Sequence, residues 1–150
     1  MAYKYMAVGY LMKNGKVLLN HHKKFNKWTP PGGHMEEDET PDQAVIREWK
    51  EELGLDVCVL PAIESFFKGD SNATPVPMPF YIDLEREGFQ VPHLGFYFYV
   101  KLLDENQVIN IQESELYDAK WFSKEDLPTL PTFDQVRVLS EYVINNYPIK

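Results

Sequence analysis

Residues 41–53 are the part of the chain whose structure the sequence constrains most. Thr40 is a preferred residue at a helix N-cap, Pro41 suits the first helical position, and Gln43 completes a capping box. Gly54 follows at a position where helices commonly end in the left-handed conformation. These signals predict a helix over residues 41–53 with a defined start and a defined end.

Strand patterns dominate on both sides of this helix. Two apolar runs, KYMAVGYLM and KVLLNHH, are joined at Asn14-Gly15, a dipeptide that favours a hairpin because both residues tolerate positive φ. Pro30 and Pro31 then end strand pairing, since proline cannot donate a hydrogen bond to a β-ladder. Further strands are predicted at LDVCVL, FYIDLE, HLGFYFYVKLL and YDAKWFS.

The aromatic run HLGFYFYVKLL is expected to be a central strand. Alternation along it places Phe96 and Phe98 on one face and Tyr97 and Tyr99 on the other, and one of these faces could stack a base. A last helix is predicted after Thr132 as its cap. The order of strands, helix, strands and helix indicates one α+β domain over residues 1–150, with a mixed β-sheet between helices.

Composition excludes several functional classes. The chain has 150 residues and a net charge of −8, which argues against stable nucleic-acid binding because that needs a basic face. No apolar run approaches the length of about 20 residues that spans a membrane, and the N-terminal residues lack a signal-peptide pattern. We therefore expect a cytoplasmic protein. Cys58, the single cysteine, lies in an apolar strand and is expected to be buried.

The predicted helix has two different faces. Apolar side chains form one stripe at helical spacing: Val45, Ile46, Trp49 and Leu53. The carboxylates of Glu48, Glu51 and Glu52 form an arc next to this stripe. Arg47 and Lys50 point away from the stripe and from the arc. Such like-charge pairs destabilise a helix by a few tenths of a kcal/mol, roughly 0.2–0.5 per pair. The arc is therefore either a solvated surface or a site for a hard cation such as Mg²⁺ or Mn²⁺.

The complete pattern from Gly33 to Leu55 resembles the Nudix box. Its fixed positions are occupied by Gly33, Glu39, Arg47, Glu48, Glu51, Glu52 and Gly54, with apolar Trp49 and Leu55 between and after them. The order of hairpin, strands and C-terminal helix is also similar to the Nudix α/β/α sandwich, with its mixed β-sheet between helices. The resemblance implies a metal-dependent pyrophosphohydrolase that cleaves a nucleoside diphosphate linked to another moiety, by water attack at phosphorus.

The resemblance also assigns roles to individual residues. Glu48 and Glu52 would ligate Mg²⁺ or Mn²⁺, with Glu51 as a further ligand and the Gly33 backbone carbonyl completing the metal site. Arg47 is forked and permanently charged, so it can orient a carboxylate, and Glu39 can pair with it.

A base must take the proton of the attacking water. The candidates are Glu48 or Glu51 within the box and Glu113 or Glu115 in a later loop.

Basic residues precede the box. Lys23, Lys24 and Lys27 would contact the substrate phosphates or simply flank a hairpin. His34 follows the glycine pair, where a hydrogen-bonding structural role is favoured over catalysis.

Several functions remain open at this point. A Nudix-fold sensor would bind a nucleotide without turnover, an isomerase of isopentenyl diphosphate type would require Cys58 in its active site, and an acidic scaffold helix would bind no metal. The expected partner is a small nucleotide-type diphosphate, with no membrane, no stable nucleic acid and a possible homodimer, as in many relatives. The pattern does not specify which diphosphate is cleaved.

Overall fold

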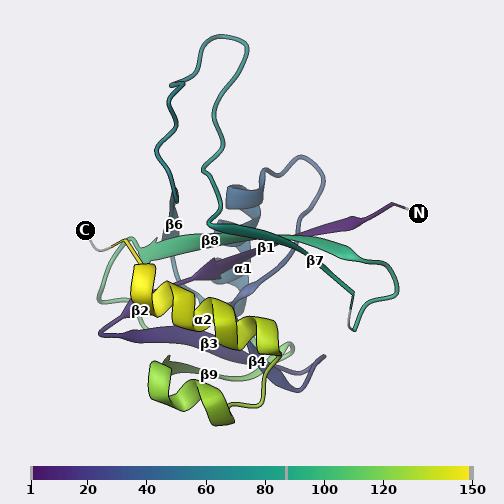
Figure 1. The fold of residues 1–150 in the computed structure, drawn as a ribbon, viewed down its shortest axis with the longest axis vertical. Helices are drawn as coiled ribbons and strands as arrows, with labels where there is room; N and C mark the ends of the chain where they lie inside the picture. Colours follow the sequence, from purple (N-terminus) through teal and green to yellow (C-terminus); the bar gives the residue numbers. More distant parts are fainter. Residues whose placement is uncertain (1, 87, 149–150) are drawn as a thin grey trace.

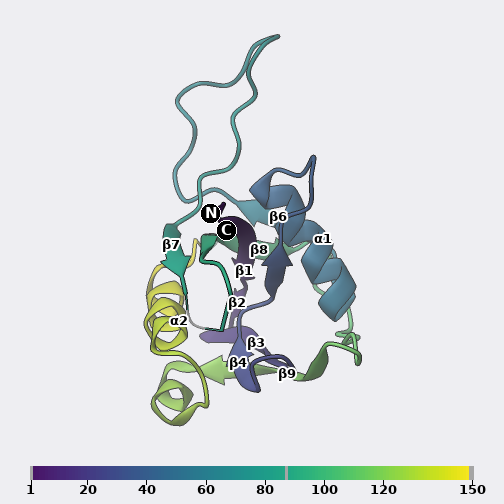
Figure 2. The same ribbon diagram turned by 90° about the vertical axis from the view of Figure 1, so that its right-hand side faces the viewer.

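The computed structural model describes residues 2–86 and 88–148, which fold into two β-sheets flanked by helices. Helix α1 (Pro41–Leu53) and helix α2 (Asp134–Asn146) lie on opposite sides of the strands, as the two views in Figure 1 and Figure 2 show. The predicted α+β sandwich, with a mixed β-sheet between helices, is confirmed.

The first sheet is built around β8 (His93–Leu102), which is its central strand as predicted. On one side β8 pairs in parallel with β1 (Lys4–Tyr10), and β1 pairs antiparallel with β5 (Gly32–His34). Along the other side of β8, β6 (Val57–Leu60) and β7 (Tyr81–Glu85) lie one after the other, both antiparallel to it. The sheet therefore mixes both pairing directions.

The second sheet is entirely antiparallel. Its central strand is β3 (Lys16–His22), which pairs with β2 (Met12–Lys13), β4 (Lys27–Thr29) and β9 (Leu116–Ser123). A short 3-10 helix, η1 (Lys124–Thr129), follows β9, and the Asp126 carboxylate accepts a hydrogen bond from the Ser123 N–H at 2.8 Å. This contact caps the start of η1.

The predicted hairpin at Asn14-Gly15 is only partly correct. Both residues have positive φ, 54° and 75°, but the turn joins β3 only to the two-residue strand β2. The first apolar run instead forms β1 in the other sheet, because its seven residues pair in parallel with β8. A turn dipeptide determines the local reversal of the chain, whereas the neighbours of the flanking strand depend on distant residues.

Helix α1 has the predicted bounds. The Gln43 side chain accepts a hydrogen bond from the Thr40 N–H at 3.0 Å, and Gly54 ends the helix with φ of 67°. Helix α2 differs, because its N-cap is Phe133 rather than Thr132. The Thr132 hydroxyl instead donates to the Trp28 carbonyl, so this side chain connects β4 to the segment before the helix.

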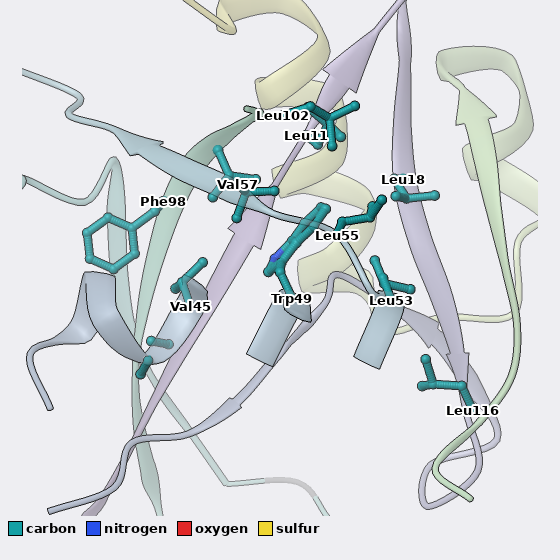
Figure 3. Packing of buried hydrophobic residues seen from close by; sticks show 13 residues of the cluster. Leu11, Leu18, Val45, Trp49, Leu53, Leu55, Val57, Phe98, Leu102 and Leu116 are labelled. Atoms are coloured by element: carbon teal, nitrogen blue, oxygen red, sulfur yellow. The ribbon is translucent and has the colours of Figure 1, made fainter. Parts of the chain in front are cut away.

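The apolar side chains of α1 anchor the helix to the first sheet. Val45, Trp49 and Leu53 are fully buried, and Figure 3 shows them in one cluster with side chains from β6 and β8. The Trp49 indole donates to the Pro31 carbonyl at 3.2 Å. Ile46, predicted in the same stripe, is 38% exposed because the packed stripe is narrower than the helical wheel suggests.

Gly9 on β1 permits this close helix packing. A Cβ added there would lie 2.6 Å from the Trp49 Nε1 and 2.9 Å from the Val100 Cγ1, closer than such atoms approach. We expect Gly9→Ala to lower the free energy of unfolding by about 1–3 kcal/mol, the usual cost of overpacking. Equilibrium urea denaturation followed by far-UV circular dichroism measures this, and an unchanged midpoint would contradict the packing argument.

Alternation along β8 is confirmed. Phe96 and Phe98 pack with the cluster under α1, and Tyr97 and Tyr99 belong to the cluster on the α2 side. Between β6 and β7 the chain leaves the sheet as a long arm without helix or strand, residues 61–80, visible in Figure 1 and Figure 2. Within the described residues, no helix has the length and apolarity needed to cross a membrane.

Candidate active site

A cleft of about 840 Å³ lies between α1, strand β7 and the start of α2. One wall carries the α1 carboxylates of Glu48, Glu51 and Glu52, and Gly33 lies beside them. The opposite wall carries a second polar group from other elements: Asp83, Glu85, Tyr97 and Gln135. The fold therefore brings the predicted box residues to a cavity large enough for a small organic ligand.

The three carboxylates of α1 are buried to different degrees. Glu52 is 4% exposed, whereas the side chains of Glu48 and Glu51 are 15% and 49% exposed. Burial raises the pKa of Glu52 well above its usual range, and the Gly32 N–H, which donates to its Oε1 at 2.9 Å, offsets this only in part. Burial also raises the pKa of Glu48, against the opposing effect of Arg47. Buried carboxylates with raised pKa values in a cleft are typical of functional sites.

Arg47 connects the acidic residues around the helix. Its Nε and Nη2 donate to the two carboxylate oxygens of Glu39 at 2.6 and 2.9 Å, so the predicted pair is confirmed and is bidentate. This pairing lowers the pKa of Glu39. The Arg47 Nη1 donates to Glu48 at 2.9 Å and to Glu51 at 3.2 Å. The helical wheel placed Arg47 away from the carboxylates, which is wrong because its long side chain turns back toward them.

Gly33 lies directly against Glu48. A Cβ at Gly33 would be 2.7 Å from the carboxylate carbon and Oε1 of Glu48, so any side chain there would displace that carboxylate. Gly33 belongs to β5, whose pairing with β1 fixes its position next to α1. The glycine therefore provides the space in which the Glu48 carboxylate lies.

The donor chemistry of this wall suits a hard cation, because all its side-chain donors are carboxylate oxygens. As the side chains lie here, no group of three or more His, Cys, Asp or Glu residues within 2–86 and 88–148 is arranged to hold a metal ion. Arg47 draws Glu48 and Glu51 toward its guanidinium, and Glu52 turns toward the Gly32 N–H. Rotation of these side chains would be needed to bring their oxygens together.

The later loop also contributes to the cleft. Glu115 is one of the lining residues, and Glu113 is not. Of the three predicted lysines, Lys24 lines the cleft. The Nζ of Lys23 instead lies 5.3 Å from the Tyr117 ring centroid, and that of Lys27 lies 4.2 Å from the Phe133 centroid.

His34 has the predicted hydrogen-bonding role. Its Nε2 lies 2.6 Å from the Nε2 of His93, a residue for which the sequence indicated no role and which is 3% exposed. The His93 Nδ1 lies 2.8 Å from the Val91 carbonyl oxygen. Burial, and then the neighbouring His93, lower the pKa of His34. The pair thus links β5 to the start of β8.

Sequence reasoning missed the polar wall opposite α1. Tyr97 donates to Glu85, and the Gln135 Nε2 donates to the Asp83 Oδ2 at 2.5 Å and to the Tyr97 oxygen at 2.7 Å. Burial raises the pKa of Glu85 to about 7. The available signal was the alternation of Asp83 and Glu85, which puts both carboxylates on one face of β7.

Cys58 lies away from the cleft. It is half-buried on β6, paired with Lys101 of β8, and is not among the lining residues. Cys58 is therefore less buried than expected, because β6 is an edge strand of its sheet. Cys58, the single cysteine of the chain, is therefore not placed to act in an isomerase mechanism that needs a cysteine in the active site.

Comparison with known proteins gives a consistent result. The family model described as NUDIX domain matches residues 4–142. A crystal structure of a NUDIX-family hydrolase from Clostridium perfringens superimposes with a TM-score of 0.81 and 28% identity, covering 99% of this chain and 100% of that one. Similarity thus extends over nearly the whole fold rather than only over α1.

Two curated relatives are similar over different lengths. The chain is 26% identical over 122 residues to the asymmetrical bis(5'-nucleosyl)-tetraphosphatase of Mus musculus, which covers 81% of this chain and 72% of that protein. It is 57% identical over 30 residues to the 8-oxo-dGTP diphosphatase of Proteus vulgaris, which covers 20% of this chain and 27% of that protein. The chain thus spans only about a quarter of the length of the Proteus relative.

Proposed function

The chain belongs to the Nudix family of hydrolases, and we propose that it cleaves a nucleoside diphosphate linked to another moiety with the help of Mg²⁺ or Mn²⁺. Nudix hydrolases act on substrates that contain a diphosphate. The observation that carries the proposal is the placement of Glu48, Glu51 and Glu52 on one wall of a cleft that Glu115 and Lys24 also line.

The acidity of the cleft supports a need for a cation. A diphosphate would meet the carboxylates of α1, and the only lysine and arginine side chains among the described lining residues are Lys24, Arg47 and Arg86. Glu48, Glu51 and Glu52, with the Gly33 backbone carbonyl, are the groups proposed to hold Mg²⁺ or Mn²⁺. A bound divalent ion would supply positive charge for the phosphate oxygens and lower the pKa of the attacking water.

Arg47 and Glu39 act by positioning. Glu39 holds two nitrogens of the guanidinium, and the third, Nη1, contacts Glu48 and Glu51. The guanidinium can therefore stay fixed by Glu39 while the two helix carboxylates rotate toward a ligand. The arrangement explains why a forked, permanently charged side chain suits this position.

The proton of the attacking water needs an acceptor. Glu115 is proposed as this base because it lines the cleft from a loop outside the box, with Glu48 and Glu51 as the alternatives. Among the predicted lysines the phosphate role is retained for Lys24, the one that lines the cleft.

Turnover assays test the proposal directly. Nucleoside triphosphates, nucleotide sugars, ADP-ribose and dinucleoside polyphosphates are incubated with the protein in Mg²⁺, in Mn²⁺ and in chelator. We expect metal-dependent release of a phosphorylated product from at least one class, raised on the order of 10²-fold or more above the chelator control. Equal rates with chelator would contradict the metal assignment.

A nucleotide sensor without turnover is the alternative. It would bind one of these compounds in the same panel and release no product. All box glutamates are present in this chain, which favours hydrolysis over binding alone. Cytoplasmic location, a homodimeric state and the lack of stable nucleic-acid binding stay predictions.

A further inference from the structure

The wall opposite α1 carries polar groups that the proposed hydrolysis does not use. We call Asp83, Glu85, Tyr97 and Gln135 the acceptor cluster. They come from β7, β8 and the first turn of α2, and all four line the same cleft as the α1 carboxylates. A substrate whose phosphates lie at α1 would extend its other part toward this cluster.

Hydrogen-bond acceptors outnumber donors in the cluster. The donors are one hydroxyl of Tyr97 and one amide group of Gln135, and both are engaged within the cluster. When both are ionised, the acceptors are two carboxylates, each with two oxygens and about four lone-pair sites. The Asp83 Oδ1 is buried and has no hydrogen-bond partner among the described residues. The cluster is therefore short of N–H or O–H donors.

Burying these carboxylates also lowers the stability of the fold when no ligand is bound. Burial raises the pKa of Glu85 to about 7, which shows that its charged form is disfavoured in the fold. Apolar residues at positions 83 and 85 would pack against β8 without such a penalty. Gly95 faces them across the ladder, and a Cβ there would lie 2.8 Å from the Glu85 Oε2 and 3.2 Å from the Asp83 Oδ1. The absence of a side chain at Gly95 therefore leaves the space that the Asp83 and Glu85 carboxylates occupy.

Aromatic rings surround this part of the cleft. Tyr81 on β7 and Phe89 after that strand line it. Phe25, in the turn between β3 and β4, and Phe133, just before α2, line it as well. The rings of Tyr81 and Tyr97 have centroids 5.5 Å apart, and Phe25 contacts both Phe89 and Phe133 edge-on. Flat rings stack on such surfaces, and single bases are recognised by stacking combined with hydrogen bonds to their Watson–Crick edge.

We propose that the acceptor cluster binds the base of the nucleotide substrate and selects a purine with two adjacent N–H donors, as in guanine. This inference rests on the proposed function, because it places the phosphates at α1. Guanine presents N1–H and the exocyclic amino group side by side, which matches two neighbouring carboxylates, Asp83 and Glu85, that each accept one hydrogen bond. Inosine lacks the amino group, and adenine lacks both donors in this arrangement, so each analogue leaves a carboxylate oxygen unpaired.

Binding of neutral nucleosides tests the inference without turnover. Guanosine, inosine, adenosine and free ribose are titrated into the protein with chelator present, and dissociation constants are obtained from NMR chemical-shift changes. We expect guanosine to bind at least about tenfold more tightly than inosine, the usual effect of losing one hydrogen bond to a charged acceptor. Ribose that binds as tightly as guanosine would show that the cleft recognises the sugar, which overturns the inference.

Two substitutions locate the preference. Asp83→Asn and Glu85→Gln keep the size of each side chain but replace a carboxylate oxygen with an amide donor. We expect each to reduce the guanosine-to-adenosine affinity ratio by about tenfold or more. Glu64→Gln, on the exposed arm outside the cleft, makes the same change in charge and is expected to leave the ratio unchanged. A ratio that persists in both cluster variants overturns the inference, as does equal or undetectable binding of all three nucleosides.

The results separate this inference from the proposed function. Guanosine preference that depends on Asp83 and Glu85, with no turnover of any substrate, supports the base site and removes the hydrolase assignment. Metal-dependent turnover with the same kcat/KM for guanine, hypoxanthine and adenine nucleotides supports the hydrolase and overturns the base site.

Discussion

Replacing Glu52 with glutamine is expected to lower kcat by about 100-fold while the protein stays folded. Glu52 is the most buried of the three α1 carboxylates, and its partner in the fold is the uncharged Gly32 N–H. The glutamine carbonyl can still accept that hydrogen bond, so the local structure is retained. What the amide cannot supply is the negative charge proposed to hold the divalent ion. Loss of an outer-shell partner of a metal ligand commonly costs 10- to 100-fold, and loss of the ligand itself is expected to cost at least as much.

The same substitution is expected to leave stability equal or higher. The pKa of Glu52 is raised in the folded state, so folding disfavours its charged form. The stability associated with this group is therefore greatest at acidic pH, where it is protonated in both states, and decreases as pH rises from the unfolded-state pKa through the folded-state pKa. At neutral pH, with chelator present, the neutral amide avoids this penalty. Urea denaturation of both proteins at pH 7 measures the difference.

A matched control separates charge from position. Glu37→Gln makes the same chemical change on an exposed residue of the segment before α1, outside the cleft, and is expected to leave kcat within about twofold of wild type. A Glu52→Gln variant with near-wild-type kcat would remove Glu52 from the metal site. Loss of activity together with loss of stability would indicate a structural role instead.

Local signals explain what the sequence could predict about the fold. The bounds of α1 follow from Thr40 and Gly54, because a cap and a left-handed glycine act on neighbouring backbone groups. The partner of β1 could not be predicted, since its parallel pairing joins Lys4 to His93 across most of the chain. Thr132 shows the same limit, because its hydroxyl bonds to the distant Trp28 carbonyl instead of capping the helix that follows.

The candidate site divides in the same way. Residues of the box lie within one helix and the glycine segment before it, so their spacing along the sequence predicts that Glu48, Glu51 and Glu52 are neighbours. The acceptor cluster is assembled from three separate elements, and neither Asp83 nor Gln135 carries a local signal that they meet. Residue spacing along the sequence also does not predict where a long, flexible side chain points. Arg47 is an example, because its side chain turns back toward the carboxylates.

Replacing Arg47 with lysine is expected to lower kcat by about 10- to 100-fold, although the positive charge is kept. Arg47 makes five hydrogen bonds, and their acceptors are Glu39, Glu48, Glu51 and the His34 carbonyl. A lysine ammonium has three donors on a single atom and cannot hold Glu39 bidentately while it contacts Glu48. Glu48 and Glu51 would then lose their fixed partner and repel each other.

Stability is expected to fall by about 1–2 kcal/mol in Arg47→Lys, less than for a buried ion pair because the side chain is 22% exposed. Arg137→Lys is the matched control. Arg137 donates to the Leu127 and Leu130 carbonyls and to Asp134, has a side chain 31% exposed, and does not line the cleft. We expect it to lose similar stability and to keep its kcat. A similar fall in kcat in both variants would mean that general destabilisation, rather than carboxylate positioning, explains the Arg47 result.

A double-mutant cycle tests whether Glu39 acts through Arg47. If Glu39 only fixes the guanidinium, Glu39→Gln lowers kcat in wild type but has little further effect in Arg47→Lys, so the two changes are not additive. If Glu39 contacts the substrate or the metal itself, the two effects on kcat multiply. The bidentate contact favours the first result, because both Glu39 oxygens already accept hydrogen bonds from Arg47. Non-additivity in kcat, measured beside the stabilities of all four proteins, would therefore define Glu39 as a positioning residue.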